Sequence, residues 1–306
     1  MNKSTVTFTS EGLNCVGWLY MPTYASEQQV PAIVMAHGFS LVKEAYLDKY
    51  AEIFCHGGFA VLVFDYRNFG ESDSYLPQHL EPYEQIKDYR NAISWLSTLR
   101  EIDENKIGIW GTSYSGGHVL HIGAVDRRVK AVVAQVPTIN GRKGAERKMG
   151  HEKFEQFLKN LTNYRTERYI TGERKMHPVV SEDGVAAQPH PDAYKWFTET
   201  AETVAPSWKN EITLESMEHY VEYNPASFIE FISPTPLMMI AAMDDGITPP
   251  DLINEAFEEQ AKEPKKLLKL PRGHFDVYNG ATFEQASKES LKWFQQHLLT
   301  KQRSKS

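Results

Sequence analysis

Short continuous apolar runs recur along the first 140 residues and return after residue 232. Runs of this kind, without polar alternation, are typical of strands buried on both faces of a sheet. The predicted strands cover residues 16–20, 32–36, 60–64, 106–110, 129–134, 236–243 and 266–270. Apolar residues spaced three and four apart predict helices between them, over residues 44–56, 86–99, 251–261 and 283–299. This alternation predicts a mostly parallel α/β sheet with helices on both faces.

The alternation stops near Asn140 and resumes near residue 233. Helical spacing continues in between, carried first by Phe154, Phe157, Leu158 and Leu161 and then by Leu214, Met217 and Val221. A stretch with Pro and His at residues 176–192 is predicted to be a loop. Because sheet-forming segments lie on both sides, we expect one α/β core from residues 1–140 and 233–306. Residues 141–232 are then an inserted helical cap.

Composition narrows the class of protein without indicating its chemistry. The chain has 306 residues, about twice an average domain, so length alone permits one large domain or two small ones. Its 33 Lys and Arg against 40 Asp and Glu give a net charge of −7, which argues against nucleic-acid binding. Two cysteines, Cys15 and Cys55, cannot build a disulfide framework or a cysteine-only zinc site.

The longest apolar run, residues 237–243, is far shorter than the ~20 residues that span a bilayer. The first residues lack the apolar centre of a signal peptide. We therefore expect a soluble, cytoplasmic protein with no membrane partner, and a homodimer stays an open possibility.

Ser113 lies in Gly111-Thr112-Ser113-Tyr114-Ser115, directly after a predicted strand and before a helix. This is the context of a nucleophile elbow, although glycine is usual where Ser115 stands. We expect the turn to expose Ser113 Oγ at the carboxyl end of the sheet, facing the positive N-terminus of the helix. The alternatives are a simple turn, a phosphate-binding loop, or Ser115 as the nucleophile.

A serine nucleophile needs a base, and the base needs an orienting carboxylate. His274 follows the last predicted strand in a glycine-bearing loop, so it can reach Ser113. Asp244 and Asp245 both follow the strand at 236–243. Asp245 is assigned because it stands four residues before a proline, and Asp244 is kept as the alternative. The order Ser, Asp, His is that of α/β-hydrolases.

An acyl-transfer site also needs donors for the oxyanion. His37-Gly38-Phe39 directly follows the strand at 32–36. We expect the backbone N–H groups of Phe39 and Tyr114 to be the donors and the His37 side chain to support the loop.

Other polar residues have simpler interpretations. His118 and His121 could bind a metal, but no third ligand is evident and helix packing is favoured. Arg67 and Asp88 are expected to form a structural pair. A basic run could recognise an anionic carrier group, although a solvated helix face is favoured; it comprises Arg142, Lys143, Arg147, Lys148 and Lys153. We expect no metal and no organic cofactor.

Several segments carry a family resemblance: His37-Gly38-Phe39, Val42-Lys43-Glu44, and residues 64–72, 111–118, 126–132 and 273–275. They resemble the dienelactone-hydrolase-like branch of the α/β-hydrolases, which includes fungal polyketide transferases and bacterial YcjY-type hydrolases. The resemblance covers roughly residues 1–140 and 233–300. It implies an eight-stranded α/β-hydrolase fold, a triad of Ser113, His274 and Asp245, and esterase, thioesterase or acyl-transfer activity. The chain departs from the pattern at Ser40 and Leu41, where glycines are expected.

The sequence thus predicts a serine hydrolase that cleaves a small-molecule carboxylic ester or thioester through an acyl-enzyme on Ser113. Aromatic residues are expected either to contact the acyl group or to pack in the core, namely Phe39, Tyr114, Phe154, Phe157, Trp196, Phe197 and Tyr220. The alternatives are an acyltransferase that passes the acyl group, for example a polyketide, to an alcohol, a peptidase, and a non-enzymatic ligand-binding protein on a hydrolase scaffold. Serine at the elbow excludes dehalogenase and epoxide hydrolase chemistry, which use an aspartate there.

Overall fold

The computed structural model describes residues 1–26 and 28–299 and contains one eight-stranded sheet. Its strands are β1 (Asn2–Ser10), β2 (Leu13–Met21), β3 (Val30–Ala36), β4 (Ala60–Phe64), β5 (Ile102–Thr112), β6 (Val129–Gln135), β9 (Leu237–Ala242) and β10 (Lys265–Leu270). They lie in the order β1-β2-β4-β3-β5-β6-β9-β10. Strand β2 pairs antiparallel with β1 and β4, and every other neighbouring pair is parallel. The predicted eight-stranded, mostly parallel sheet is confirmed.

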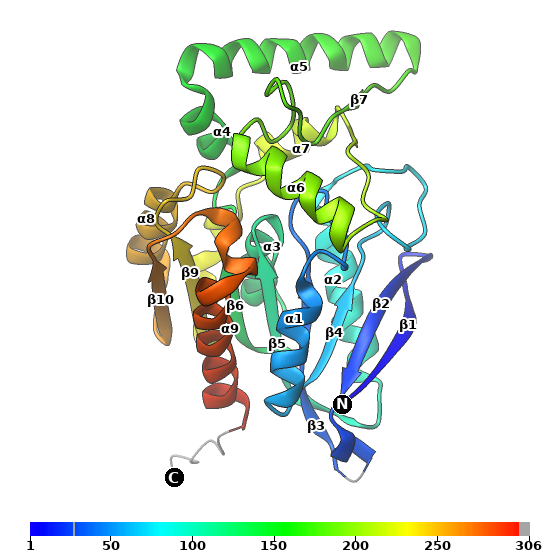
Figure 1. Cartoon of the computed structure of the whole chain (residues 1–306), viewed down its shortest axis with the longest axis vertical. Helices are drawn as coiled ribbons and strands as arrows, with labels where there is room; N and C mark the ends of the chain where they lie inside the picture. Colours follow the sequence, from blue (N-terminus) through cyan, green and yellow to red (C-terminus); the bar gives the residue numbers. More distant parts are fainter. Residues whose placement is uncertain (27, 300–306) are drawn as a thin grey trace.

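Helices cover both faces of this sheet (Figure 1). On one face lie α1 (Leu47–His56) and α9 (Gly280–Phe294), which contact each other. On the other face lie α2 (Pro82–Ser97), α3 (Tyr114–Val125) and α8 (Pro250–Gln260). Every residue of β3, β4 and β9 is buried, because helices exclude water from both sides of these strands. Further short elements are the 3₁₀ helices η1 (Thr23–Ser26) and η3 (His274–Tyr278) and the π-helix η4 (Gln295–Leu299).

The edge strand β1 is absent from the sequence-based prediction. It pairs with β2 along its whole length, from Asn2 opposite Met21 to Ser10 opposite Leu13. Of its residues only Phe8 and Ser10 are buried, and threonines occupy most of the alternate positions. An edge strand needs few apolar residues because one of its faces and one of its edges meet water. The apolar pattern is therefore too weak there to predict a strand.

The segment from residue 141 to 232 contains α4 (Gly141–Met149), α5 (His151–Thr171), α6 (Pro191–Thr203), α7 (Ser216–Glu222) and η2 (Pro225–Phe231). Figure 1 shows α4 to α7 above the end of the sheet where the parallel strands terminate. Two strands of two residues each, β7 (Met176–His177) and β8 (Ile212–Thr213), also pair within this segment. The predicted loop at 176–192 thus begins with a short strand and ends inside α6.

Element η2 differs from the rest of this segment because it packs on α3 and α8, in the layer that covers the sheet. The division of the chain into a core of 1–140 and 233–306 and a cap of 141–232 stays a prediction. Residues 300–306 of that core lie outside the described residues.

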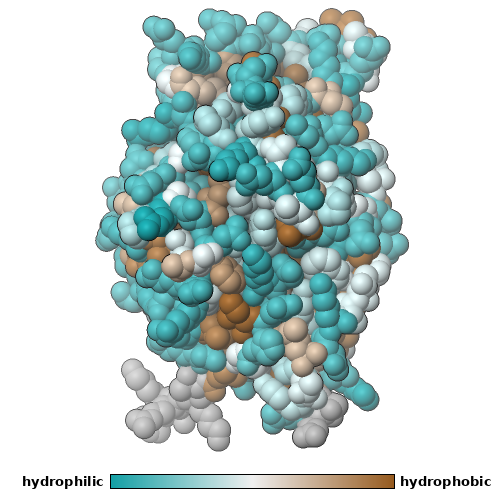
Figure 2. Space-filling model, viewed as in Figure 1, coloured by the Kyte–Doolittle hydropathy of each residue, from teal (hydrophilic) through white to brown (hydrophobic). Residues whose placement is uncertain are grey.

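The surface of the protein is mostly hydrophilic, as expected when the apolar residues of the sheet are buried. Hydrophilic residues cover most of the face in Figure 2, and hydrophobic residues form only small groups on it. Tyr50, Tyr89 and Trp110 are among the largest fully buried side chains. Within residues 1–26 and 28–299, no helix has both the length and the apolar character that a membrane span requires.

Candidate active site

Ser113 forms the turn between β5, which ends at Thr112, and α3, which begins at Tyr114. Its φ of 57° and ψ of −116° lie in a region that non-glycine residues rarely adopt, at a cost of about 1–3 kcal/mol. Its N–H donates to the Gln135 carbonyl at 2.8 Å, and its carbonyl accepts from the N–H of Thr138 at 2.9 Å. The end of β6 and the loop after it therefore hold the strained turn.

Small residues around Ser113 permit this geometry. A Cβ on Gly111 would collide with the Ser115 carbonyl, and a Cβ on Gly38 would lie 3.0 Å from Ser113 Cβ. The loop after β3 therefore lies directly against Ser113. Ser115 is fully buried, and its Oγ forms a hydrogen bond of 2.8 Å with Tyr66 Oη. The hydroxyl of Ser115 is thus paired with Tyr66, whereas that of Ser113 meets an imidazole.

The structure brings Ser113, His274 and Asp245 into one line of hydrogen bonds. His274 Nε2 lies 3.1 Å from Ser113 Oγ, and His274 Nδ1 lies 2.7 Å from Asp245 Oδ2. Each of the three residues is at most 8% exposed. Because the carboxylate can only accept, Nδ1 carries the proton and Nε2 is free to accept from the serine hydroxyl.

Asp245 is held in place by the turn that follows it. Its Oδ1 accepts the N–H groups of Ile247 at 2.7 Å and Thr248 at 2.8 Å, and its Oδ2 accepts the Thr248 hydroxyl at 2.8 Å. Burial opposes ionisation, but the charge of His274 and the hydrogen bonds from His274 and Thr248 hold the pKa of Asp245 below its usual value. Asp244 is exposed, and its N–H donates to the Arg272 carbonyl. The imidazole therefore meets Asp245 and not Asp244.

Phe39 and Tyr114, the expected oxyanion donors, lie together beside Ser113. Tyr114 is the first residue of α3, so its N–H has no acceptor within the helix. Phe39 follows Gly38, which touches Ser113, and the Phe39 and Tyr114 rings meet edge to face at 5.6 Å. Ser40 has a φ of 57°, the left-handed region in which glycine is least strained, at a position where the family pattern predicts glycine.

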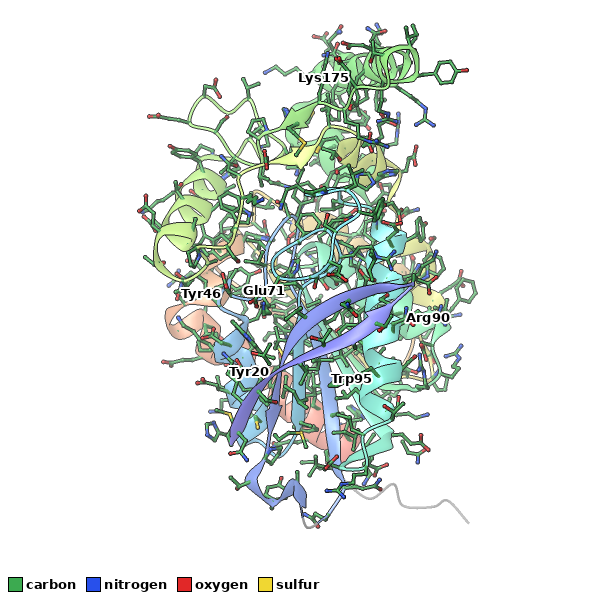
Figure 3. The ribbon with its side chains drawn as sticks, turned by 90° about the vertical axis from the view of Figure 1, so that its right-hand side faces the viewer. Tyr20, Tyr46, Glu71, Arg90, Trp95 and Lys175 are labelled. Carbon is green, nitrogen blue, oxygen red and sulfur yellow. The ribbon has the colours of Figure 1, made fainter. Side chains whose placement is uncertain are left out.

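A buried ion pair, which the sequence analysis missed, fixes this loop. The backbone N–H of Lys43 donates to Asp65 Oδ1 at 2.6 Å, and its Nζ donates to Asp65 Oδ2 at 2.7 Å. The same Nζ pairs with Glu71, which lies in Figure 3 at the level where the sheet ends. The loop after β3 is thereby tied to the loop after β4. The segments 42–44 and 64–72 carried the family resemblance, and they contain all three residues.

Burial lowers the pKa values of His37, His118 and His121, so these three packing histidines are neutral at pH 7. Burial lowers the pKa of His37 to about 4, and its Nδ1 lies 3.0 Å from the Gly38 carbonyl. His118 Nδ1 and Nε2 lie 2.7 Å from Tyr223 Oη and 2.9 Å from Gln85 Oε1. The His121 ring packs on Phe228. In the part of the chain that the structure describes, no group of three His, Cys, Asp or Glu residues could hold a metal.

The expected pairing of Arg67 with Asp88 is present. Arg67 Nε and Nη2 donate to Asp88 Oδ1 at 2.9 and 2.6 Å, and both residues are buried. This pair joins the loop after β4 to α2.

A cavity of about 750 Å³ opens between α4, α5, the loop before α6 and the turn that follows Asp245. Its apolar lining is formed mainly by Met149, Phe157, Leu161, Leu214, Met217 and Ile247. Of the aromatic residues expected to contact an acyl group, Phe157 lines this cavity, whereas Phe154 is fully buried. Trp196 stacks on Phe275 at 4.7 Å and Phe197 packs on Trp196 at 5.3 Å. The sequence places all of these residues in the 141–232 segment, but helical spacing does not predict which of their side chains line a cavity.

Comparisons with known proteins cover nearly the whole chain. Residues 17–276 match the family model described as X-Pro dipeptidyl-peptidase (S15 family). The chain is 29% identical over 304 residues to the thiohydrolase aneE of Aspergillus aculeatus, covering 96% of this chain and 92% of that protein. It is 29% identical over 302 residues to the polyketide transferase grgF of Penicillium sp, covering 97% of both.

The crystal structure of the α/β hydrolase GrgF from Penicillium sp. sh18 has a TM-score of 0.84 with this structure at 27% identity, covering 98% of this chain and all of that one. The family match spans all three residues of the hydrogen-bonded line, from Ser113 to His274. These findings confirm the predicted fold and enzyme class. The chain belongs to the X-Pro dipeptidyl-peptidase (S15) family and is a serine hydrolase with the α/β-hydrolase fold.

Proposed function

We propose that the protein cleaves a small-molecule carboxylic ester or thioester through an acyl-enzyme on Ser113. The observation that carries this proposal is the continuous line of hydrogen bonds from Ser113 Oγ through His274 to Asp245, with distances of 3.1 and 2.7 Å. A serine hydroxyl is a weak nucleophile until a base removes its proton. The line supplies that base and holds its tautomer.

In the first half of the reaction, His274 Nε2 takes the Ser113 proton as Oγ attacks the carbonyl carbon. The N–H groups of Phe39 and Tyr114 donate to the oxyanion, and Asp245 stabilises the imidazolium. His274 then gives the proton to the leaving alkoxide or thiolate. In the second half, water attacks the acyl-enzyme carbonyl and His274 takes a proton from that water. His274 then returns the proton to Ser113 Oγ as the bond between Oγ and the acyl carbon breaks, and the carboxylic acid leaves.

The cavity beside Ile247 is our proposed site for the acyl group. Its volume of about 750 Å³ falls within the usual range of small-molecule sites. Ile247 donates its N–H to Asp245, so the cavity wall begins next to the triad.

Acyl transfer to an alcohol is the second candidate, because one relative is named a polyketide transferase. Hydrolysis and transfer share the acyl-enzyme and differ only in which nucleophile removes the acyl group. The name thiohydrolase, borne by another relative, favours a thioester and water.

The experiment is turnover of p-nitrophenyl butyrate and of a butyryl thioester by the wild type and by Ser113→Ala. We expect the variant to lose activity by a factor on the order of 10⁴ or more, while its melting temperature stays within a few degrees of the wild type. Activity retained by the variant contradicts the proposal. Butyl butyrate formed when butanol is added assigns transfer, whereas butyrate alone assigns hydrolysis.

A further inference from the structure

The structure divides the basic run of the sequence into two groups. Three members pair with carboxylates at distances of 2.7 to 3.7 Å, namely Arg142 with Glu155, Lys143 with Glu255, and Arg147 with Asp251. Lys148 and Lys153 have no carboxylate oxygen within 4.0 Å among residues 1–26 and 28–299. A solvated helix face therefore describes the first group but leaves two lysine charges without a carboxylate partner among the described residues.

Both of these lysines line the cavity of about 750 Å³. Lys148 is half-buried, and its Nζ lies 5.6 Å from the centre of the Tyr220 ring. Neither Asp nor Glu occurs among the described residues that line the cavity. Burial lowers the pKa of His177 in the same lining, so that ring is neutral at pH 7. The fixed charge of the cavity is therefore positive, in a chain whose net charge is −7.

Most of the other lining residues are apolar, and they indicate the chemistry of the rest of the molecule that the cavity binds. Of the apolar lining residues, Phe157 and Leu161 lie on α5, Met217 lies on α7, and Leu214 lies two residues before α7 begins. Ile247 continues this apolar wall to the residues beside Asp245. Unpaired cations next to a low-dielectric wall concentrate anions. The cavity thus matches a molecule with an apolar body and an anionic group.

We propose that this cavity selects an acyl substrate that bears an anionic group, with the apolar part on the α5 and α7 wall and the anion on Lys148 and Lys153. The inference rests on the proposed acyl-enzyme function. The anion has two possible sources. One source is a carboxylate at the far end of the acyl chain, and the other is a phosphate on the thiol leaving group. Lysine ammonium groups bind both anions through charge-assisted hydrogen bonds.

The experiment uses two matched pairs of substrates on the full chain. The p-nitrophenyl ester of hexanoic acid is compared with the mono-p-nitrophenyl ester of adipic acid. The N-acetylcysteamine thioester of hexanoic acid is compared with hexanoyl-coenzyme A. In each pair only one member carries the anion. We expect the wild type to prefer the anionic member of one pair, which identifies whether the charge belongs to the acyl chain or to the leaving group.

The variant is Lys148→Gln combined with Lys153→Gln. We expect the ratio of kcat/KM between the anionic and neutral member of the preferred pair to fall about tenfold or more, mainly through KM, since a hydrogen bond to a charged group is lost. The double arginine variant keeps the charge and keeps the preference. Lys159→Gln is the matched control, because Lys159 is an exposed lysine of α5 that does not line the cavity.

A wild type without preference in either pair overturns the inference, as does a double glutamine variant that keeps the preference. If none of the four substrates is turned over, the proposed function is contradicted for these carbonyls. Binding then decides the inference by itself: adipate or coenzyme A raises the melting temperature of the wild type more than that of the double glutamine variant. Equal shifts overturn it.

Discussion

Two neighbouring aspartates of identical chemistry have different surroundings in this protein. Asp245 accepts hydrogen bonds from two backbone N–H groups, one hydroxyl and the imidazole, whereas Asp244 is exposed. At the scale of single residues, the orientation of His274 therefore depends on one carboxylate and not on the local density of negative charge.

This asymmetry predicts unequal effects of two single substitutions. Asp245→Asn should lower kcat by about 10³ to 10⁴, because an amide that donates to Nδ1 selects the wrong imidazole tautomer. Asp244→Asn should stay within about twofold of the wild type, since an exposed carboxylate away from the imidazole exerts only a weak, solvent-screened field. Steady-state turnover of a p-nitrophenyl ester measures both. A larger loss in Asp244→Asn would move the carboxylate role to that residue.

The sequence predicts that these three side chains lie together, and the reason is physical. Ser113, Asp245 and His274 each follow a strand of a parallel sheet, and the carboxyl ends of such strands meet at one edge. Lys43 could not be foreseen in the same way, because its burial depends on Asp65 in a different loop. The sequence pattern also could not separate Phe157 from Phe154, since both lie on the apolar side of one helix.

At the scale of elements, the stretch that includes α6 and the residues after it contacts two loops of the candidate active site. Trp208 Nε1 donates to the Ser40 carbonyl at 2.9 Å, next to Phe39. Trp196 stacks on Phe275, which is adjacent to His274, at 4.7 Å. One stretch of the 141–232 segment therefore contacts both the loop of the expected oxyanion donors and the loop of the expected base.

The contact at Ser40 predicts that Trp208→Phe impairs turnover more than folding. Phenylalanine keeps an aromatic ring beside Phe197 but cannot donate to the Ser40 carbonyl. Losing a hydrogen bond worth about 0.5–1.5 kcal/mol should lower kcat roughly two- to tenfold, with KM little changed, if the bond holds the Phe39 N–H in position. Kinetics with a p-nitrophenyl ester and thermal melting measure the two effects.

Trp293→Phe is the matched control for this variant. Trp293 is a buried tryptophan of α9 whose Nε1 has no hydrogen-bond partner among the described residues. The Trp293→Phe variant should be less stable than the wild type, because phenylalanine has a smaller ring, and it should keep the kcat of the wild type. A Trp208→Phe protein that loses stability while keeping kcat would show that the contact only packs the segment.

The elements that the sequence predicted well are those buried on two faces. Strand β4 has the predicted bounds, and β3 and β9 differ from them by one or two residues, because unbroken burial gives an unbroken apolar pattern. The sequence did not predict strand β1 or the two-residue strands β7 and β8. An edge strand and a very short pair of strands both bury few residues, so they produce little apolar pattern in the sequence.

At the scale of the whole molecule, the basic run shows what the sequence could not reveal. The partners of Lys143 and Arg147 are Glu255 and Asp251, which lie on α8 more than 100 positions further along the chain. Only the fold decides which cations of the run are neutralised. The net charge of −7 therefore says nothing about the local positive charge at the cavity.

Buried neutral histidines give the whole molecule a predictable response to acid. Burial lowers the pKa values of His37 and His121 to about 4 and holds that of His118 well below its usual value, whereas an unfolded histidine titrates near 6.5. Between these values the unfolded chain binds protons that the folded chain does not. Stability should then be full above about pH 6.5 and fall as the pH drops toward 4. The lowered pKa of Asp245 acts below its unfolded value of 3.8, outside this window.

His121→Phe tests this account, because it removes one histidine that binds a proton in the unfolded chain in this pH range. The buried Nδ1 of His121 has no hydrogen-bond partner among the described residues, so the substitution removes no hydrogen bond from that atom. A phenyl ring keeps the contact with Phe228, whose centre lies 3.9 Å away. The melting temperature of the variant should match the wild type at pH 7 and exceed it progressively from pH 6 to 4.5. His56→Phe, measured over the same pH range, is the control, because it replaces an exposed histidine and leaves the buried rings in place. Melting curves of the wild type and His121→Phe that stay parallel over this range would show that His121 takes up its proton equally in the folded and unfolded chains.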